Sequence, residues 1–504
     1  MPIKMRPSLQ FSFANDKELT TSNLASALCA INYQSIKMFS WFTIVAGLAG
    51  ATLLAGCATY KPEPLPLEKL VQNFENRSLE SSGLKHFFEQ NLHRDFSNQP
   101  HDSWNFPELS LAAFYFHPAL DVARAQLNIT QAGAVSAAAR PNPTVGVTPE
   151  YNFNAASGVS PWIYGLNFDW PLETAGKRGY RIAKSHHLSD AARWNIHTAA
   201  WQVRTDLRNA LVDYATAEKR IALLQNQKTI QAQIISSLEA QQKAGAISQF
   251  EITTARIAGA RAQFDLADSQ NRLAESRTRV AAAIGIPVEA IKNLKLVFDF
   301  NAAEFPLTAP ELRRAALQNR GDVLSLLSEY AASESTLQLE IARQYPDVHL
   351  GTGYQFDQGE NKWSLGLTAE LPVLNRNQGG IADAKARRAE TAARFLTLQA
   401  KVIAEVDRAA VNYSGAQAQL KVAESLTAAQ EKQRSSLESQ VKAGEIARPE
   451  LLNSDLERAA IELQKFDASL KVQQALGDLE NALQRPLDGV EFSKDPRAEE
   501  RNNP

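Results

Sequence analysis

Acidic side chains recur on the polar faces of four alternating segments of the sequence. In the segment from Trp162 to Trp170 every second residue is bulky and apolar, and Asp169 lies on the opposite face with asparagine and glycine. Glu150, Asp347 and Glu370 lie on the corresponding faces of the other three segments. Carboxylates gathered along one path attract cations and repel anions, which makes these four residues candidates for a cation-conducting lining. The alternative is that they are solvated residues near strand ends.

The alternation predicts four strands, each with one apolar and one polar face. Tyrosine, tryptophan and phenylalanine gather towards the strand ends, as in the aromatic girdles of membrane barrels. The predicted apolar faces consist of Val145, Val147, Tyr151 and Phe153; Trp162, Tyr164, Leu166, Phe168 and Trp170; Val348, Leu350, Tyr354 and Phe356; and Trp363, Leu365, Leu367 and Leu371. A half-buried sheet in a soluble domain shows the same pattern, but about ten residues per strand also suffice to cross a bilayer at the tilt of a barrel.

Four strands are too few to close a barrel. In lipid, the open edges of such a sheet leave backbone N–H and C=O groups without partners, at several kcal/mol each. A membrane-spanning sheet of this size therefore requires several copies of the chain to share one barrel, and three copies of four strands supply twelve.

The sequence contains an internal duplication with a period of about 200 residues, which is far longer than a solenoid repeat. In the strand region, Ala139, Arg140, Pro143, Tyr151, Phe153, Trp162, Gly165, Leu166 and Pro171 reappear as Ala342, Arg343, Pro346, Tyr354, Phe356, Trp363, Gly366, Leu367 and Pro372. Further along, Asp206, Ala210, Val212 and Tyr214 correspond to Glu405, Ala409, Val411 and Tyr413. Each half is predicted to contain a helix, two strands, a very long helix and a returning helix, in that order.

The long helices are predicted from about Gly179 to Ala244 and from about Gly380 to Ala443. Both stretches lack proline and contain little glycine, and apolar residues recur in them at helical spacing. At 1.5 Å per residue each helix is roughly 100 Å long, which is typical of coiled-coil or tubular assemblies.

Each long helix ends in the same tripeptide, formed by Lys243, Ala244 and Gly245 in the first half and by Lys442, Ala443 and Gly444 in the second. The glycines are placed as helix C-caps, so the chain turns back at these two tips. The surrounding stretches, SSLEAQQKAGAI and SSLESQVKAGEI, are the most similar parts of the two halves, which favours a role shared by the two tips over that of a plain helix cap. Glu239 and Glu438 are candidates for a constriction near the tips, although exposed helix faces often carry such charges.

Composition excludes several classes of function. The 53 basic and 55 acidic side chains give a formal net charge of -2, without the basic excess expected of a protein that binds nucleic acid. The sequence has no nucleophile elbow, phosphate-binding glycine loop or clustered ligand set, so we expect neither an enzyme nor a cofactor. His186 and His187 are adjacent on a helix and point in different directions, so no metal site is predicted.

Cys57 follows an apolar run from Met38 to Gly56 that begins after Lys37 and closes in small residues, as export signals do. The tetrapeptide Leu-Ala-Gly-Cys resembles a bacterial lipobox, in which the cysteine is lipidated and becomes the first mature residue. Lipidation anchors a chain to the membrane without threading it through, and alanine at position 58 resembles the sorting pattern of outer-membrane lipoproteins. The alternative is a buried or membrane-spanning helix, which the sequence YKPEPLP after the cysteine would break.

Over about residues 109–487 the chain resembles the TolC family of outer-membrane efflux ducts. The resemblance is carried by the doubled order of elements and by two motifs, PLETAGKRGYRIA after the second strand and LPVLNRNQGGIADAKARR after the fourth. These motifs are most similar to those of the heavy-metal branch of the family, which commonly reads Pro-Leu-Glu-Leu-Gly-Gly-Lys-Arg and Asn-Arg-Asn-Gln-Gly. The chain departs from the first motif at Thr174 and Ala175.

The resemblance implies a mixed α/β membrane protein that forms a homotrimeric duct. Its shared twelve-stranded barrel would lie in the outer membrane, and a long helical barrel would extend into the periplasm. The tips would dock to a periplasmic membrane-fusion adaptor served by an inner-membrane RND transporter. The chain would be a passive, gated, lipid-anchored conduit for metal cations or small toxic molecules. A duct for type I protein secretion and a structural lipoprotein that spans the periplasm without a channel are the alternatives.

The sequence predicts six segments. They are an N-terminal extension and lipoprotein signal at 1–57, a periplasmic linker at 58–106, a first repeat at 107–290, an inter-repeat segment at 291–308, a second repeat at 309–487 and a polar tail at 488–504. We expect the inter-repeat segment and the tail to pack outside the tunnel or to be mobile.

Overall fold

A computed structural model of the chain describes residues 59–92, 103–300 and 308–487. The chain divides into two units, Met1–Leu70 and Val71–Pro504. In the first unit, residues 59–70 are exposed, and helix α2, Leu67–Glu75, begins there. Cys57 and the predicted export signal lie outside the described residues. The described elements after α2 all belong to the second unit.

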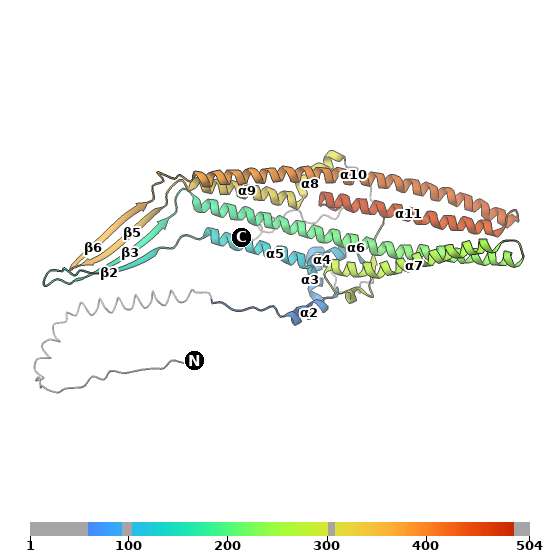
Figure 1. Ribbon diagram of the computed structural model, residues 1–504, viewed down its shortest axis with the longest axis horizontal. Helices are drawn as coiled ribbons and strands as arrows, with labels where there is room; N and C mark the ends of the chain where they lie inside the picture. The colour runs from blue at the N-terminus through green and yellow to red at the C-terminus, as the bar shows by residue number, and fades with distance from the viewer. Residues whose placement is uncertain (1–58, 93–102, 301–307, 488–504) are drawn as a thin grey trace, which may run out of the picture. The chain divides into compact units, whose positions relative to one another are not determined.

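The second unit contains two repeats with the predicted order of elements (Figure 1). The first repeat consists of α5, Pro118–Ala138; β2, Thr144–Tyr151; β3, Trp162–Leu172; α6, Lys177–Lys243; and α7, Gln249–Ile284. The second consists of α9, Gly321–Ala342; β5, Val348–Asp357; β6, Glu360–Ala369; α10, Gln378–Ala443; and α11, Arg448–Leu483. The duplication and both very long helices are therefore confirmed.

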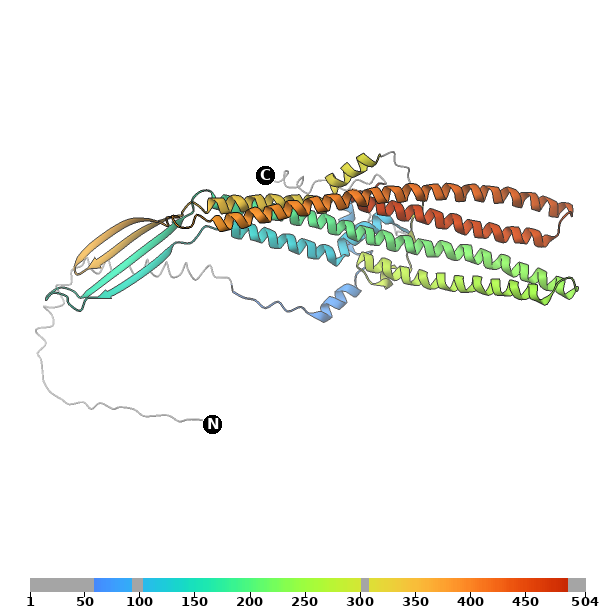
Figure 2. The same cartoon turned by 45° about the horizontal axis from the view of Figure 1, so that its top comes forward.

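A single antiparallel sheet joins the two repeats, with strand order β2-β3-β5-β6 (Figure 2). The central pair, β3 with β5, combines one strand from each repeat, which leaves β2 and β6 as the edges. The predicted alternation is correct along all four strands, but two predicted residues lie outside them. Phe153 lies in the turn after β2. This turn begins where the amide of Asn152 donates to the carbonyl of Pro161 and the amide of Asn154 donates to the side-chain oxygen of Asn152. Leu371 follows β6, next to Pro372, which cannot donate to a ladder.

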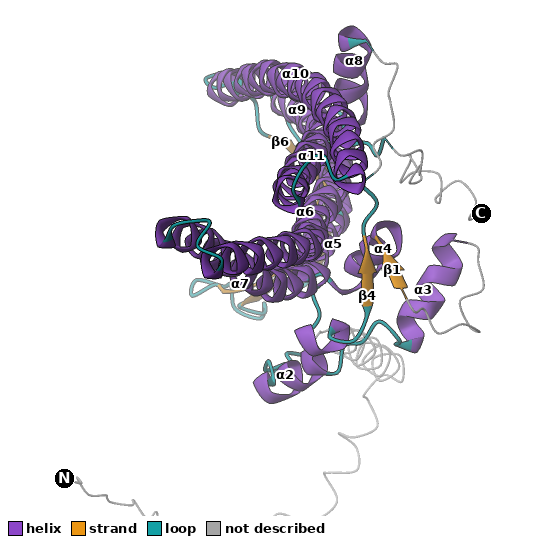
Figure 3. Cartoon of the chain, turned by 90° about the vertical axis from the view of Figure 1, so that its right-hand side faces the viewer, coloured by secondary structure: helices purple, strands orange, loops and turns teal. Residues whose placement is uncertain are grey.

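Two short strands tie the inter-repeat segment to the linker. β1, Ser103–Asn105, pairs in parallel with β4, Lys295–Val297, so that Trp104 lies opposite Leu296 (Figure 3). Both of these side chains are buried. Residues 295–297 therefore belong to the folded body. Periodicity could not reveal strands of three residues, because so short a run contains no repeat.

Each repeat has its own hydrophobic core. The first core gathers around α6, α7 and the preceding helices α3, Ser82–Leu92, and α4, Phe106–Phe116, and includes Leu207 and Ile284. The second gathers around α10, α11 and α8, Ala309–Asn319, and includes Val406 and Leu483, the counterparts of those two residues. Across the described ranges, no helix combines the length and the apolar character needed to cross a membrane.

Candidate functional site

The four-stranded sheet has one polar, glycine-rich face. Two neighbouring rows across the strands illustrate it: Thr144, Asp169, Gly351 and Gly366 form the first, and Gly146, Asn167, Gly353 and Ser364 form the second. The opposite face carries exposed aromatic and aliphatic side chains, among them Trp162, Trp170 and Trp363. Because β-strands alternate strictly, each row of small or polar residues has an apolar row on the other side. The sheet thus separates an apolar surface from a polar one.

The four predicted lining residues lie at different heights along this sheet. Glu150 is exposed on β2, opposite Ile163, near the end of the strands that is remote from the helices. Asp169 lies on β3 near the helical end, where its Oδ2 is 2.9 Å from Nδ1 of His349. Asp347 precedes β5 and Glu370 follows β6, so these two belong to the junction between sheet and helices.

An open hollow of about 770 Å³ at this junction brings three of the four carboxylates together. Asp169, Asp347 and Glu370 line it, with Lys177 and His349 among their neighbours. Glu150 is absent from this lining. The role of all four in conduction stays a prediction. Among the described residues there is no group of three or more histidine, cysteine, aspartate or glutamate side chains arranged to hold a metal ion.

Asp347 is the most strongly held of these carboxylates. Its Oδ1 accepts hydrogen bonds from Lys177 Nζ at 2.8 Å and from the amide of Thr174 at 2.9 Å. Burial of Asp347 opposes its ionisation, but these donors and the charge of Lys177 outweigh that effect and hold its pKa below the usual value. Lys177 also donates to the carbonyl of Tyr345 at 2.7 Å, and Thr174 Oγ1 donates to the carbonyl of Pro346. The motif at the start of α6 is therefore hydrogen-bonded to the segment that leads into β5.

Two consecutive residues in the left-handed region set the direction of α6. Ala175 has φ 53° and Gly176, the N-cap of α6, has φ 73°. At the corresponding start of α10, the N-cap is Asn377, with φ 58°. Glycine and asparagine adopt such angles readily, whereas alanine does so at a cost of roughly 1 kcal/mol. Ala175, one of the two departures from the family motif, is thus a strained position.

Both predicted docking tips adopt the same Schellman motif. In the first tip, the amides of Gly245 and Ala246 donate to the carbonyls of Gln242 and Gln241, respectively. In the second tip, the amides of Gly444 and Glu445 donate to the carbonyls of Val441 and Gln440. Both glycines have φ 74°, and Lys243, Ala244, Lys442 and Ala443 form the adjoining helix ends. Between the tips lies a hollow of about 310 Å³ lined mostly by apolar side chains, including Leu238, Phe250, Pro449 and Leu452. The docking role itself stays a prediction.

The two predicted constriction residues are engaged in ion pairs within their own hairpins. Glu239 Oε1 lies 2.7 Å from Arg256 Nη2. Glu438 lies 2.9 Å from Lys442 Nζ and 3.1 Å from Arg434 Nη1, and the hydrogen bond from Lys442 contributes most to lowering the pKa of Glu438. The lowered pKa favours the ionised form of Glu438. The part of Glu239 and Glu438 in a constriction is a prediction.

A buried ion cluster that sequence reasoning missed joins the two repeats midway along the helices. Arg204 of α6 pairs with Glu480 of α11 at 3.1 Å, and both side chains are about 5% exposed or less. Arg208 lies 3.6 Å from the same carboxylate and donates to Gln473 at 3.0 Å. The guanidinium of Arg204 also lies 4.8 Å from the ring centroid of Trp201. Arginines on an amphipathic helix ordinarily point to solvent, so nothing in the periodicity revealed this cluster.

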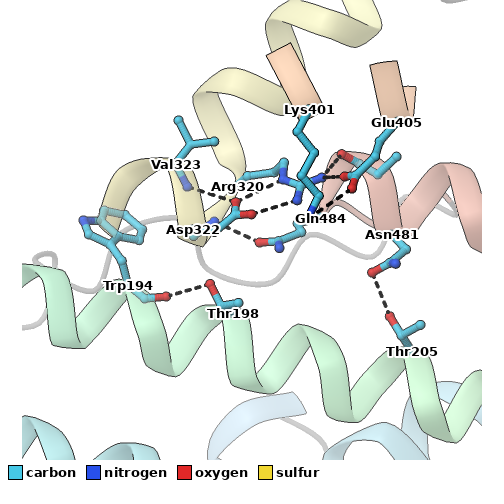
Figure 4. Close-up of polar contacts among 12 residues, drawn as sticks. Trp194, Thr198, Thr205, Arg320, Asp322, Val323, Lys401, Glu405, Asn481 and Gln484 are labelled. Carbon is cyan, nitrogen blue, oxygen red and sulfur yellow. Dashed lines mark hydrogen bonds and ion pairs between the residues drawn. The ribbon is translucent and has the colours of Figure 1, made fainter. Parts of the chain in front are cut away.

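A second polar cluster surrounds the start of α9 (Figure 4). Arg320 pairs with Asp322 at 2.7 Å and with Glu405 of α10 at 2.8 Å, and Gln484 accepts the amide of Gly321. Close packing requires Gly321 here, because a Cβ would lie 2.6 Å from Thr198 Oγ1 on α6. The backbone of α9 thus approaches α6 of the other repeat directly.

Comparison with known proteins identifies relatives of both repeats. Residues 110–286 and 312–484 match the family described as outer membrane efflux protein. The chain is 25% identical over 267 residues to the cobalt-zinc-cadmium resistance protein CzcC of Cupriavidus metallidurans, a match covering 53% of this chain and 62% of that protein. It is 26% identical over 289 residues to the nickel-cobalt-cadmium resistance protein NccC of Alcaligenes xylosoxydans xylosoxydans, covering 54% and 62%. The matches thus span less than two thirds of either relative.

Solved structures share the fold. The outer membrane protein VceC of Vibrio cholerae superposes with a TM-score of 0.62 at 18% identity, over 75% of this chain and 95% of VceC.

Proposed function

The chain belongs to the outer membrane efflux protein family, and from this membership we propose that it is the outer-membrane duct of a tripartite efflux system. The observation that carries the proposal is the family match over both repeats, each of which contributes two strands to one amphipathic sheet. The duct itself is passive, because the sequence offers no motif for binding a nucleotide. An inner-membrane RND pump and a periplasmic adaptor deliver the cargo.

The working unit is a homotrimer. The sheet of one chain has an apolar face suited to lipid and a polar face suited to water, but it has two open edges. Three copies close these edges into a twelve-stranded barrel with the glycine-rich face inside, and the long helices continue the tunnel into the periplasm. Lipidation at Cys57 anchors each copy to the outer membrane.

The cargo consists of metal cations or small toxic molecules. Two observations favour cations: the two relatives are named for resistance to cobalt, zinc, cadmium and nickel, and carboxylates recur on the polar face and at the junction. A duct for secreted proteins has the same architecture and is the second candidate. A structural lipoprotein without a channel does not explain why one face of the sheet is polar and rich in glycine.

Conductance of the purified, lipidated protein in planar bilayers under a salt gradient tests the proposal. We expect discrete steps with a reversal potential that indicates cation preference. Combining Glu150→Gln, Asp169→Asn and Glu370→Gln should reduce this preference without abolishing the steps, whereas Glu289→Gln on a distant exposed turn should change nothing. Anion preference of the unchanged protein would refute the carboxylate lining. Silence that persists in variants with opened tips would favour the structural lipoprotein.

A further inference from the structure

We propose that His349 is a transient ligand for exported metal ions, with Nε2 of its ring available to Zn²⁺, Co²⁺ or Ni²⁺ at the junction between sheet and helices. The inference rests on the proposed duct and deepens it by naming the class of cargo that this position recognises. That class is zinc and the divalent transition-metal ions, which imidazole suits as a ligand. Mg²⁺ and Ca²⁺ prefer oxygen ligands, so the ring distinguishes the two groups of cations.

The imidazole of His349 is held by a carboxylate on the neighbouring strand. Nδ1 of His349 on β5 lies 2.9 Å from Oδ2 of Asp169 on β3. An ionised carboxylate can only accept hydrogen bonds, so in the neutral ring Nδ1 carries the proton and Nε2 keeps its lone pair. Among the described residues Nε2 has no hydrogen-bond partner, and the side chain is 43% exposed. A histidine that binds a metal ion commonly donates its other N–H to a carboxylate, which orients the ring and makes it a better ligand.

The sheet leaves open space beside this pair. Asp169 lies directly opposite Gly351, which in turn lies opposite Gly366 on β6. Gly351 is two residues from His349 on the same strand and therefore shares the polar face with it. Within 4 Å of a Cβ at either glycine there would be only backbone oxygens. A hydrated cation therefore has room next to the ring, in the junction hollow of about 770 Å³.

The charges around the hollow favour a cation at this pair. Lys177 and Arg343 line the hollow, but each is already paired with a carboxylate, at 2.8 Å and 2.6 Å respectively. Asp169 and Glu370 also line it, and within the described ranges neither has a lysine or arginine as an ion-pair partner. Negative charge without a fixed counter-ion therefore remains close to the imidazole, and it attracts a doubly charged ion more strongly than a singly charged one.

The internal duplication shows that the sheet itself does not require the imidazole. The counterpart of Asp169 in the second repeat is Glu370, which is also acidic, whereas the counterpart of His349 in the first repeat is Gly146. Both hairpins have the same register at this position. The hairpin thus forms with glycine as well as with histidine, and the ring is free to serve binding rather than folding.

A single imidazole suits a conduit better than a complete metal site does. Within the described part of the chain there is no group of three or more histidine, cysteine, aspartate or glutamate side chains that could retain an ion. A conducting path needs contacts that are strong enough to attract an ion and weak enough to release it. An ion that takes one nitrogen from His349 and water in its other positions meets both conditions.

Chemical labelling of histidines in the full-length, lipidated protein tests this contact without depending on conduction. Diethyl pyrocarbonate modifies the unprotonated imidazole nitrogen, and mass spectrometry assigns the extent of modification to each histidine. We expect Zn²⁺ to slow the labelling of His349 at least about threefold, at a concentration at which Mg²⁺ has no effect. His186 is the internal control, because it is exposed on α6 and has no ion pair among the described residues. Zn²⁺ should slow its labelling far less.

Asp169→Asn separates the charge of the carboxylate from its hydrogen bond. Asparagine still accepts the proton of Nδ1 but is neutral, so protection of His349 should require about tenfold more Zn²⁺. In planar bilayers, Zn²⁺ should reduce the potassium current of the wild type more than Mg²⁺ does, and His349→Asn should abolish this difference.

The labelling and the bilayer measurements separate failure of the metal contact from failure of the duct. Equal protection by Zn²⁺ and Mg²⁺, or protection of His349 no greater than that of His186, overturns the inference, and conducting bilayers then leave the proposed duct standing. A specific Zn²⁺ effect on the current that persists in His349→Asn also overturns it. Protection of His349 in a protein whose bilayers stay silent even with opened tips refutes the duct and retains the Zn²⁺ contact.

Discussion

Lys177 in the first turn of α6 donates a hydrogen bond of 2.8 Å to Asp347, the residue before β5. The contact joins residues that are 170 positions apart and belong to different repeats. It fixes how the long helix of the first repeat meets the strand of the second. It is one of the charged contacts that hold the sheet and the helices together, as is the pair of Arg181 on α6 with Glu173 after β3.

Replacing Lys177 with methionine removes this contact and leaves the Asp347 carboxylate with the amide of Thr174 alone. The expected loss of stability is about 1–2 kcal/mol, less than for a fully buried pair because the Asp347 side chain is 37% exposed. Thermal unfolding in detergent should show a lower midpoint for Lys177→Met. Arg387→Met, which removes an exposed pair on α10, should leave the midpoint unchanged. Equal midpoints for Lys177→Met and wild type would exclude the anchoring role.

Ala175→Gly should stabilise the protein. The residue adopts φ 53°, which is unfavourable for alanine but free of strain for glycine. The gain should be about 0.5–1 kcal/mol, since relief of strain is partly offset by the greater freedom of glycine in the unfolded chain. The same thermal measurement applies, with Gly176→Ala as the opposite change at φ 73°. A lower midpoint for Ala175→Gly would contradict this account.

Leucine at Gly351 or Gly366 should narrow the conducting path without disturbing the sheet. A Cβ at either position meets only ordinary contacts, the nearest being 3.7 Å and 3.9 Å away. At Gly353 a Cβ would lie 2.6 Å from Ser364 Oγ, so the same substitution there should disturb the strands instead. We expect reduced single-channel conductance with an unchanged β-sheet circular dichroism signal for Gly351→Leu and Gly366→Leu. Wild-type conductance in both would mean that this face does not line the path.

Bulky residues at both tips should abolish transport while leaving assembly intact. Gly245 and Gly444 have φ 74° and complete the Schellman turns, so valine at both would distort the surfaces predicted to meet the adaptor. Cells producing Gly245→Val with Gly444→Val should lose resistance to the exported toxic compound, although trimers still form. Gly158→Val, in the distant β2–β3 turn with φ 91°, provides a matched change at another positive-φ glycine. Full resistance in the double tip variant would refute the docking role.

Stability should fall as the pH drops below about 6.5, because of His117. This side chain accepts the amide of Ala119 at the start of α5 through Nδ1, which requires the neutral imidazole. Burial lowers the pKa of His117 from 6.5, against a smaller opposing effect of Asp206. The folded state therefore binds fewer protons than the unfolded state between the two pKa values. The stabilisation is complete above 6.5, declines as pH falls and levels off below the folded-state pKa.

His117→Asn checks this assignment. Asparagine also accepts the helix amide but does not titrate, so the variant should unfold at the same midpoint near neutral pH and lose less stability towards about pH 5. His86→Asn, at an exposed position on helix α3, serves as the control. If both variants show the wild-type profile, another group is responsible for the pH dependence.

The sequence predicted those features that arise from local patterns. Both long helices could be predicted because stretches such as 177–243 contain no proline. The strands could be predicted because apolar and polar residues alternate in each over eight or more positions. Gly245 and Gly444 were placed correctly at helix ends because a helix that ends in a left-handed residue strongly prefers glycine.

Contacts between residues that are far apart in the sequence leave no local pattern from which they could be predicted. Nothing near Lys177 in sequence indicated that its partner lies in the other repeat, and Asp347 was accordingly assigned to a strand face rather than to the junction. Arg204 and Glu480 are far apart in the sequence, and only the fold shows that they are buried together. The positive φ of Ala175 contradicts the usual preference of alanine, so only the three-dimensional structure could reveal it.

The buried pair of Arg204 and Glu480 also has a mechanical consequence. From Arg204 to the end of α6 at Lys243 the helix extends about 60 Å, which makes the hairpin a long lever with its fulcrum at this ion pair. Tilting such a lever by about 5° displaces its far end by about 5 Å, roughly the pitch of one helical turn. Side chains at the fulcrum need to shift by only a fraction of that distance. A small tilt of the hairpin therefore moves its tip by several ångströms while the ion pair stays closed.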